Sequence, residues 1–290
     1  MDWAREKETW PNAAHSRFIR CRPHDWHVQV AGRGDTLLLL HGAGGATQSW
    51  RALFPILAQS HHVVAPDLPG QGFTRLGTRL RLAPAPLAED IVALCAAEGW
   101  RPTAIVGHSA GGVLALELAE RLGSPQVIGL NAALGQFEGA AGWLFPLMAK
   151  MMALNPLIPP LLARMAGGES RARELLESTG SKIDPLGIAL YRRLMADKAH
   201  IDGTLAMMAQ WDIRPILARL ETMKTHVVLM AGEADGTVPA EVSRRAAERI
   251  PNSRYLGFPA LGHLMHEDAA NDVAVAITAA LAGQEARAAS

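Results

Sequence analysis

The sequence predicts an α/β fold in which a mostly parallel sheet is covered by helices on both faces and is interrupted by one helical insertion. Short runs of Val, Ile and Leu that end in Gly, Asp or Ser alternate with longer segments of helical spacing. Uninterrupted apolar runs are typical of strands buried on both faces, as in parallel sheets. The alternation breaks between residues 133 and 210. A chain of 290 residues can hold one such core with one insertion.

The predicted elements follow one another in a regular order. Segments 18–22 and 26–32 alternate in polarity and predict an antiparallel hairpin at the edge of the sheet. Buried strands are expected to begin at Thr36, His62, Thr103, Gln126 and His226. Helices are expected over 49–59, 86–99, 110–123 and 211–224. Strand followed by helix, repeated, favours parallel strands joined by helical crossovers.

The insertion is predicted to be a helical lid over residues 133–210, which leaves 1–132 and 211–290 as the core. It carries seven of the 11 methionines, and its apolar run is interrupted by charges and prolines too often to cross a membrane. Its candidate substrate-contacting residues are Trp143, Phe145, Met148, Met151 and Met152. These side chains could cover a flat hydrophobic ligand. Two alternatives stay open: they bury the lid on the sheet, or they contact a membrane surface weakly.

Composition excludes several classes of function. The 28 basic and 28 acidic residues balance, so nucleic acid is not expected as a partner. Cys21 and Cys95 are far apart and belong to no Cys/His cluster, which predicts a reducing compartment and no metal or other cofactor. The N-terminus is charged and has no signal-like apolar stretch. We therefore expect a cytoplasmic protein, with contact to a membrane surface left open.

Ser109 is the candidate nucleophile. It lies in Gly107-His-Ser-Ala-Gly111, a G-x-S-x-G sequence between a predicted buried strand and a predicted helix. The glycines allow a sharp strand-to-helix turn that lifts the serine clear of the sheet. The alternative is a polar residue in an ordinary tight turn.

Asp235 and His263 are the candidate acid and base. A serine hydroxyl needs a base to take its proton, and the base needs an acid to orient it. Both residues follow late strands, at the sheet edge where parallel sheets bind ligands. The order Ser109, Asp235, His263 is one of three common arrangements of a serine triad. Glu233 is the rival acid, and a surface role is the alternative for His263.

Two backbone N–H groups are candidates for the oxyanion hole. Ala110 follows Ser109 at the start of a predicted helix, and Ala43 lies in the glycine-rich turn His41-Gly-Ala-Gly-Gly45. A phosphate-binding loop is disfavoured because neither GxGxxG nor GxxxxGK[ST] is present. Asp67 is expected to fix a turn through local backbone N–H groups rather than to act in catalysis.

The motifs HGAGG, DLPGQG, GHSAG, GEAD and LGH resemble those of the α/β-hydrolase superfamily in order and spacing over essentially the whole chain. The resemblance implies the α/β-hydrolase fold with an eight-stranded sheet. Because the nucleophile position holds Ser109 and not Asp, it also implies acyl transfer or hydrolysis, unlike dehalogenases and epoxide hydrolases. The catalytic set implied is Ser109, His263 and Asp235, with Ala43 and Ala110 as oxyanion donors.

A narrower resemblance lies outside these motifs. DWAREKETWPN, AAGWLFPLMAKMMALNPLIP, TGSKIDPLGIALYRRLM and LAMMAQWD are similar to the α/β-hydrolase-type accessory proteins of magnesium chelatase in bacteriochlorophyll synthesis. This similarity implies a tetrapyrrole pathway, a hydrophobic substrate such as a porphyrin, chelatase subunits as partners, and a place in the cytoplasm or at the surface of the photosynthetic membrane. Three functions stay open: a serine hydrolase of that pathway, a porphyrin carrier without catalysis, and a general carboxylesterase.

Overall fold

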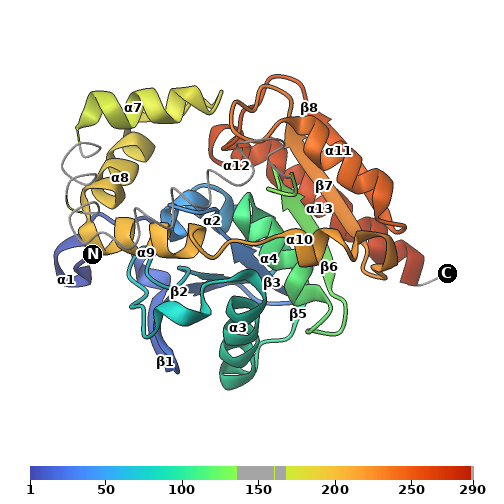
Figure 1. Cartoon of the computed structure of the whole chain (residues 1–290), viewed down its shortest axis with the longest axis horizontal. Helices are drawn as coiled ribbons and strands as arrows, with labels where there is room; N and C mark the ends of the chain where they lie inside the picture. Colours follow the sequence, from blue (N-terminus) through green and yellow to red (C-terminus); the bar gives the residue numbers. More distant parts are fainter. Residues whose placement is uncertain (136–159, 161–167, 289–290) are drawn as a thin grey trace.

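The computed structural model describes residues 1–135, residue 160 and residues 168–288. Within them, eight strands form one sheet in the order β1-β2-β4-β3-β5-β6-β7-β8 (Figure 1). The strands are β1 (Ser16–Cys21), β2 (His24–Ala31), β3 (Thr36–Leu40), β4 (His62–Pro66), β5 (Pro102–His108), β6 (Gln126–Leu130), β7 (Val227–Gly232) and β8 (Ser253–Phe258). The β1–β2 and β2–β4 pairs are antiparallel, and all other pairs are parallel. The predicted α/β-hydrolase fold with its edge hairpin is confirmed.

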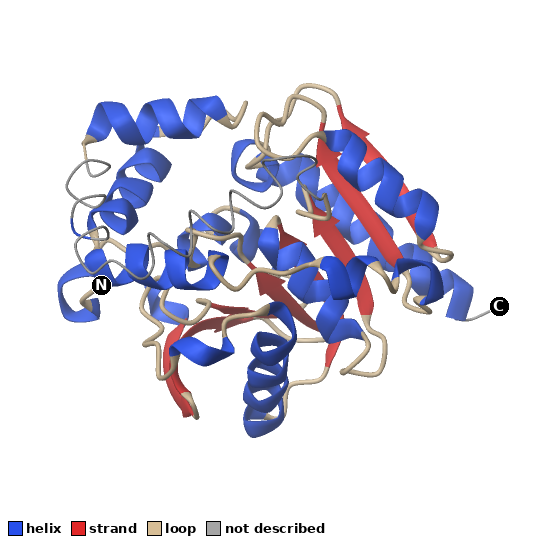
Figure 2. Ribbon diagram, viewed as in Figure 1, coloured by secondary structure: helices blue, strands red, loops and turns tan. Residues whose placement is uncertain are grey.

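The sheet packs against a buried apolar layer on each face. Figure 2 shows helices on both sides of the strands. Successive strand residues point to opposite faces, so Leu38 and Leu40 pack in one layer and Leu37 and Leu39 in the other. The first layer is covered by α3 (Pro84–Glu98), α4 (Ala110–Ala119) and α11 (Ala240–Arg249). The second is covered by α2 (Leu53–Leu57) and α13 (Ala270–Ala288).

Two expected helices are wrong in extent, and prolines explain both. Residues 49–59 form the 3₁₀ turn η2 (Thr47–Trp50) and then α2, while 211–224 form only α10 (Arg214–Leu217) and the 3₁₀ turn η4 (Leu220–Thr222). Proline cannot donate an N–H to the preceding helical turn. Pro55 and Pro215 therefore lie in the first turns of short helices that begin just before them.

The described part of the insertion is helical, as expected. It comprises α7 (Glu169–Ser178), α8 (Pro185–Ala196) and α9 (Lys198–Met208), and α7 and α8 lie at the end of the molecule away from α11 and β8 (Figure 1). The sequence did not suggest that the N-terminal segment, with α1 (Trp3–Glu6) and η1 (Ala13–His15), would pack against it. Trp10 shares a buried cluster with Leu176 and Leu194, and Arg193 donates to Glu6. The N-terminal segment thus holds the insertion on the core.

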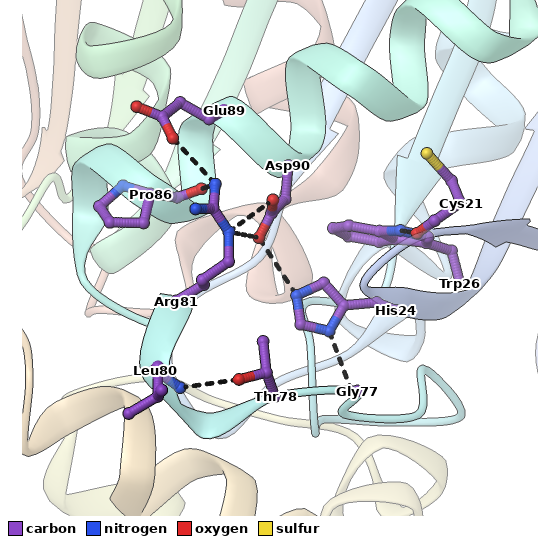
Figure 3. Close-up of polar contacts among 10 residues, drawn as sticks. All are labelled: Cys21, His24, Trp26, Gly77, Thr78, Leu80, Arg81, Pro86, Glu89 and Asp90. Carbon is purple, nitrogen blue, oxygen red and sulfur yellow. Dashed lines mark hydrogen bonds and ion pairs between the residues drawn. The ribbon is translucent and has the colours of Figure 1, made fainter.

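A buried polar cluster joins β2 to the loop before α3. The ring of His24 lies between the Asp90 carboxylate, at 3.3 Å, and the Gly77 N–H, at 3.2 Å (Figure 3). Arg81, in η3 (Arg79–Arg81), donates its Nε to the same carboxylate at 2.9 Å. Burial lowers the pKa of His24 despite the adjacent carboxylate. The cluster ties β2 to α3 and to the segment before it.

The five lid residues predicted to contact substrate, Trp143, Phe145, Met148, Met151 and Met152, lie outside the described residues. Among the helices that are described, none is both long and apolar enough to span a bilayer.

Candidate active site

Ser109 lies at the sharp turn between β5 and α4. Its backbone has φ 52° and ψ −115°, a strained conformation for a residue with a side chain. The flanking glycines make the turn possible, because a Cβ at Gly107 would overlap the Gly111 carbonyl and a Cβ at Gly111 would overlap the Leu40 carbonyl. The G-x-S-x-G prediction of a strand-turn-helix is thus reproduced in the backbone, with Ser109 half-buried at its tip.

We expect Gly111→Ala to destabilise the protein by about 1–3 kcal/mol or more, because the new methyl group would collide with the rigid carbonyl of Leu40. Gly283→Ala is the matched control, since Gly283 is also helical and its nearest contact would be the Arg254 side chain at 3.4 Å. The control should stabilise the protein by about 0.5 kcal/mol, as alanine favours a helix. Urea unfolding measures both, and equal stabilities would contradict the steric argument.

Asp235 and His263 are joined by a short hydrogen bond. The Nδ1 of His263 lies 2.7 Å from Oδ2 of Asp235, and the two side chains are 8% and 0% exposed. The other carboxylate oxygen, Oδ1, accepts the N–H groups of Thr237 at 2.6 Å and Val238 at 2.8 Å. When Nδ1 donates its proton to Asp235, the neutral ring keeps a lone pair on Nε2. That is the tautomer a general base requires.

The Asp235–His263 pair lies beside the Ser109 turn. The Nε2 of His108 donates to the His263 carbonyl at 2.9 Å, and the rings of His108 and His263 are 4.7 Å apart between centroids. The carboxyl ends of β5, β7 and β8 therefore bring all three predicted residues to one edge of the sheet. Between these described side chains, the Ser109 hydroxyl makes no hydrogen bond to His263. Catalytic bonds of this kind often tighten only when substrate is bound.

Asn131 is a residue of this site that the sequence reasoning missed. It follows β6 with φ 46°, and its Nδ2 donates to Oδ2 of Asp235 at 2.7 Å. It thereby holds the carboxylate from the side opposite Thr237. The sequence could have indicated Asn131, because it is a polar residue at the end of the buried run Gln126–Ala132. Functional polar residues of an α/β sheet lie at the carboxyl ends of its strands.

The glycine-rich turn after β3 lies against Ser109. A Cβ at Gly42 would be 3.1 Å from the Ser109 Cβ. Two side chains fix the turn at Gly44: its N–H donates to Oε1 of Gln71 at 2.7 Å, and its carbonyl accepts from Nε2 of His200 at 3.1 Å. Burial lowers the pKa of His200 to about 4, so the ring is neutral at pH 7 and donates from Nε2. A helix of the insertion, α9, thus supports this turn.

The N–H groups of Ala43 and Ala110 have no acceptor among the described residues. Ala110 is the first residue of α4, and in the described part of the chain neither N–H donates to another residue. Free backbone donors on two sides of a serine are what an oxyanion hole requires.

The rival carboxylates lie elsewhere. Glu233 points toward Arg244, 3.6 Å away, and is 40% exposed, so it does not meet His263. Asp67 is fully buried and accepts the N–H groups of Thr47 at 2.6 Å and Phe73 at 2.9 Å, which confirms its expected role in fixing turns. It also pairs with His27 at 2.7 Å, a contact that the sequence did not reveal.

A buried polar network lies behind His263. Glu267, in α12 (Met265–Asp268), accepts hydrogen bonds from Ser49 and Tyr191, each at 2.7 Å, and pairs with Arg51. Ser49 also contacts Nε2 of His266 at 2.9 Å. Burial raises the pKa of Glu267 and lowers that of His266 to about 3. These residues join three elements distant in sequence, so the sequence carries no signal for the network.

No group of three or more His, Cys, Asp or Glu side chains in the described residues is arranged to hold a metal ion. Cys21 and Cys95 are unbonded to one another, and burial raises the pKa of Cys95 to about 12.

Known proteins resemble this chain in both sequence and fold. The chain is 42% identical to the magnesium-chelatase 30 kDa subunit of Rhodobacter capsulatus over 90% of its own length and 93% of the relative's. It is 29% identical to a pimeloyl-[acyl-carrier protein] methyl ester esterase of Xanthomonas campestris pv. campestris over 87% and 96% of the two chains. The chain is therefore a homologue of the chelatase 30 kDa subunit.

A thermophilic esterase from Thermogutta terrifontis has the same fold, with a TM-score of 0.71, 21% identity and coverage of 92% and 98% of the two chains. Residues 37–277 match the Alpha/beta hydrolase family. The matched range extends from β3 to α13 and includes Ser109, Asp235 and His263. The chain belongs to the alpha/beta hydrolase family.

Proposed function

We propose that this protein is a serine hydrolase that cleaves an ester-type bond. Ser109 attacks the carbonyl carbon, His263 accepts the serine proton at Nε2, and Asp235 stabilises the resulting imidazolium. The N–H groups of Ala43 and Ala110 receive the oxyanion, and His263 then protonates the leaving alcohol. Water, deprotonated by His263, releases the acid from Ser109. The 2.7 Å hydrogen bond between Asp235 and His263, beside the strained Ser109 turn, is the observation that carries this proposal.

The substrate that the proposal favours is a hydrophobic tetrapyrrole or a by-product of tetrapyrrole synthesis, acted on in association with magnesium chelatase. The 42% identity to a chelatase 30 kDa subunit supports the pathway. The 29% identity to esterases that act on a methyl ester supports the bond class. A porphyrin could be covered by the lid predicted over 133–210, with Trp143, Phe145, Met148, Met151 and Met152 as contacts.

The direct test is labelling with a fluorophosphonate, which reacts with an activated serine. We expect the purified protein to be labelled and Ser109→Ala to lose all labelling, because Ser49, the described serine beside His266, is buried and already donates its hydroxyl proton to Glu267. Ser170→Ala, at an exposed position of α7, is the matched control and should label like the natural protein. Labelling that persists in Ser109→Ala would refute Ser109 as the nucleophile.

The second candidate is a carrier that holds a porphyrin for the chelatase without catalysis. It is favoured by the 42% identity to a relative that is named as a magnesium-chelatase subunit. A gene carrying Ser109→Ala separates the two functions in a strain that lacks the natural gene. A hydrolase predicts that pigment synthesis is not restored although the variant accumulates, whereas a carrier predicts full restoration.

A further inference from the structure

One short segment of the insertion, Thr179–Ser181, lies between the loops that carry Asp235 and His263. We call it the strap. The carbonyl of Thr179 accepts two hydrogen bonds, one from the Gly236 N–H at 3.1 Å and one from the His263 N–H at 3.0 Å. A single oxygen of the insertion therefore joins the backbone beside the acid to the backbone of the base.

The strap is needed there because the sheet no longer holds the two loops together. β7 and β8 pair up to Gly232 and Phe258, and the Ala234 N–H still donates to the Leu261 carbonyl at 3.0 Å. The backbone of Gly232 also packs closely against the carbonyls of Leu261 and Gly262. Beyond these contacts, the described hydrogen bonds that join the two loops are the Asp235–His263 side-chain bond and the pair to the shared Thr179 carbonyl. The spacing of acid and base thus depends on the strap as well as on the sheet.

Close backbone packing locks the strap in place. Gly180 has φ +77°, and a Cβ there would overlap the Ala234 carbonyl oxygen of the acid loop. A Cβ at Gly262, in the histidine loop, would overlap Gly180 in turn. At both contacts the obstacle is backbone, which cannot rotate away as a side chain can. The glycines are therefore required by contact between the strap and the two loops.

Side chains fasten the C-terminal side of the strap. The Oγ of Ser181, which is 3% exposed, accepts the Leu264 N–H at 2.8 Å, directly after His263. Downstream, Asp184 caps α8 through the Gly187 N–H at 2.6 Å and pairs with Arg51 at 2.9 Å. Arg51 also pairs with Glu267, four residues after His263. The strap is anchored to the histidine loop and to the core at once.

We propose that the strap Thr179–Ser181 is a positioning element of the active site, which sets the distance and angle between Asp235 and His263. The insertion is then part of the catalytic scaffold and not only a cover for substrate. This inference rests on the proposed hydrolase function, but the geometry of the Asp235–His263 bond can be followed without any turnover.

The test compares Gly180→Ala with Gly123→Ala. Gly123 has φ +80° and nothing within 4 Å of a Cβ, so both variants carry the same backbone strain and only Gly180→Ala collides with a loop. We expect fluorophosphonate labelling of Ser109 to slow about a hundredfold in Gly180→Ala, the cost of displacing a catalytic group by about 1 Å. Gly123→Ala should label at the natural rate.

A second readout follows the proton between His263 and Asp235. In proton NMR this Nδ1–H gives a far-downfield signal, which is assigned by its loss in His263→Ala. We expect Gly180→Ala to shift or broaden the signal and Gly123→Ala to leave it in place. An unchanged signal together with unchanged labelling in Gly180→Ala would overturn the proposal.

Ser181→Ala covers the case in which Gly180→Ala does not fold, since it removes only the hydroxyl that accepts the Leu264 N–H. It should shift the same signal and slow labelling, and a Ser181→Ala protein identical to the natural one in both readouts would equally overturn the proposal. If the natural protein is not labelled at all, the hydrolase function fails, while the NMR signal alone still decides whether the strap positions His263.

Discussion

Asp235→Asn should slow the fluorophosphonate labelling of Ser109 by about ten-thousandfold, the loss known for a serine triad whose acid becomes an amide. The hydrogen bonds around this carboxylate explain why. Thr237 and Val238 donate to Oδ1, which an asparagine oxygen can still accept. The amide nitrogen must then face the His263 ring, where Oδ2 now accepts. His263 would have to accept at Nδ1 and carry its proton on Nε2, and that tautomer cannot take a proton from serine.

The same substitution also places an NH₂ group against the Nδ2 of Asn131, a second donor. Rotating the amide by 180° would instead place its NH₂ group against the N–H groups of Thr237 and Val238, so neither orientation of the new side chain avoids facing donors. Asp212→Asn is the matched control, because Asp212 is an exposed partner of Arg214 far from the site. It should label at the natural rate. Asp235→Asn labelling within tenfold of the natural protein, with circular dichroism unchanged, would remove Asp235 from the proposed triad.

The sequence was sufficient for the three residues of the proposed triad because each follows a strand that can be recognised from its own residues. The buried runs before Ser109 and Asp235, and the half-exposed strand β8 before His263, can be recognised without knowledge of distant contacts, and parallel strands place their carboxyl ends at one edge. The same reasoning predicted Ala110, whose N–H has no partner within α4 because Ala110 begins that helix.

The strap and the network around Glu267 could not be predicted in this way. Thr179 contributes a backbone carbonyl, which every residue type possesses, and its partners lie more than fifty residues away in the chain. Its role depends on how the insertion docks, and local sequence does not specify that. Gly180 could have been noticed only as a glycine in a loop, since its close approach to Ala234 is a property of the folded backbone.

The histidines were ambiguous in sequence for a related reason. His108, His200 and His266 are polar residues that are more often exposed than buried, yet all three are at most 3% exposed here. His200 is buried where α9 meets the turns at Gly44 and Gly72. His108 and His266 are buried against each other, with ring centroids 4.4 Å apart. Whether a histidine titrates near neutrality or stays neutral is therefore decided by tertiary contacts.

These buried histidines lead to a strong prediction about stability in acid. Burial is the main cause that lowers the pKa of His200 to about 4 and that of His266 to about 3. In the unfolded chain both would titrate near the ordinary value of about 6.5. As the pH falls below about 6.5, these histidines bind protons in the unfolded state but stay neutral in the folded state. The contribution of these two histidines to the free energy of unfolding should therefore be constant well above this pH and fall from there toward pH 4 and 3.

At about pH 5 each of the two histidines should cost about 2 kcal/mol of stability relative to neutral pH, or about 4 kcal/mol together. Urea unfolding across this range measures the change. Glu267 acts in the opposite sense, because burial raises its pKa and the folded state then binds a proton more readily than the unfolded chain. A variant is needed to separate the histidine contribution from that of Glu267.

His266→Gln isolates the contribution of His266 to the pH dependence of stability, because a glutamine can still donate to Ser49 but cannot be protonated. Its stability should fall by about 2 kcal/mol less than that of the natural protein between neutral pH and about pH 5. His15→Gln, at an exposed position, is the matched control for replacing a histidine by glutamine. If His266→Gln and the natural protein lose equal stability as the pH falls, His266 must bind its proton as readily in the folded state as in the unfolded chain. That would require the bare Nδ1, which has no partner among the described residues, to carry a proton in a fully buried site.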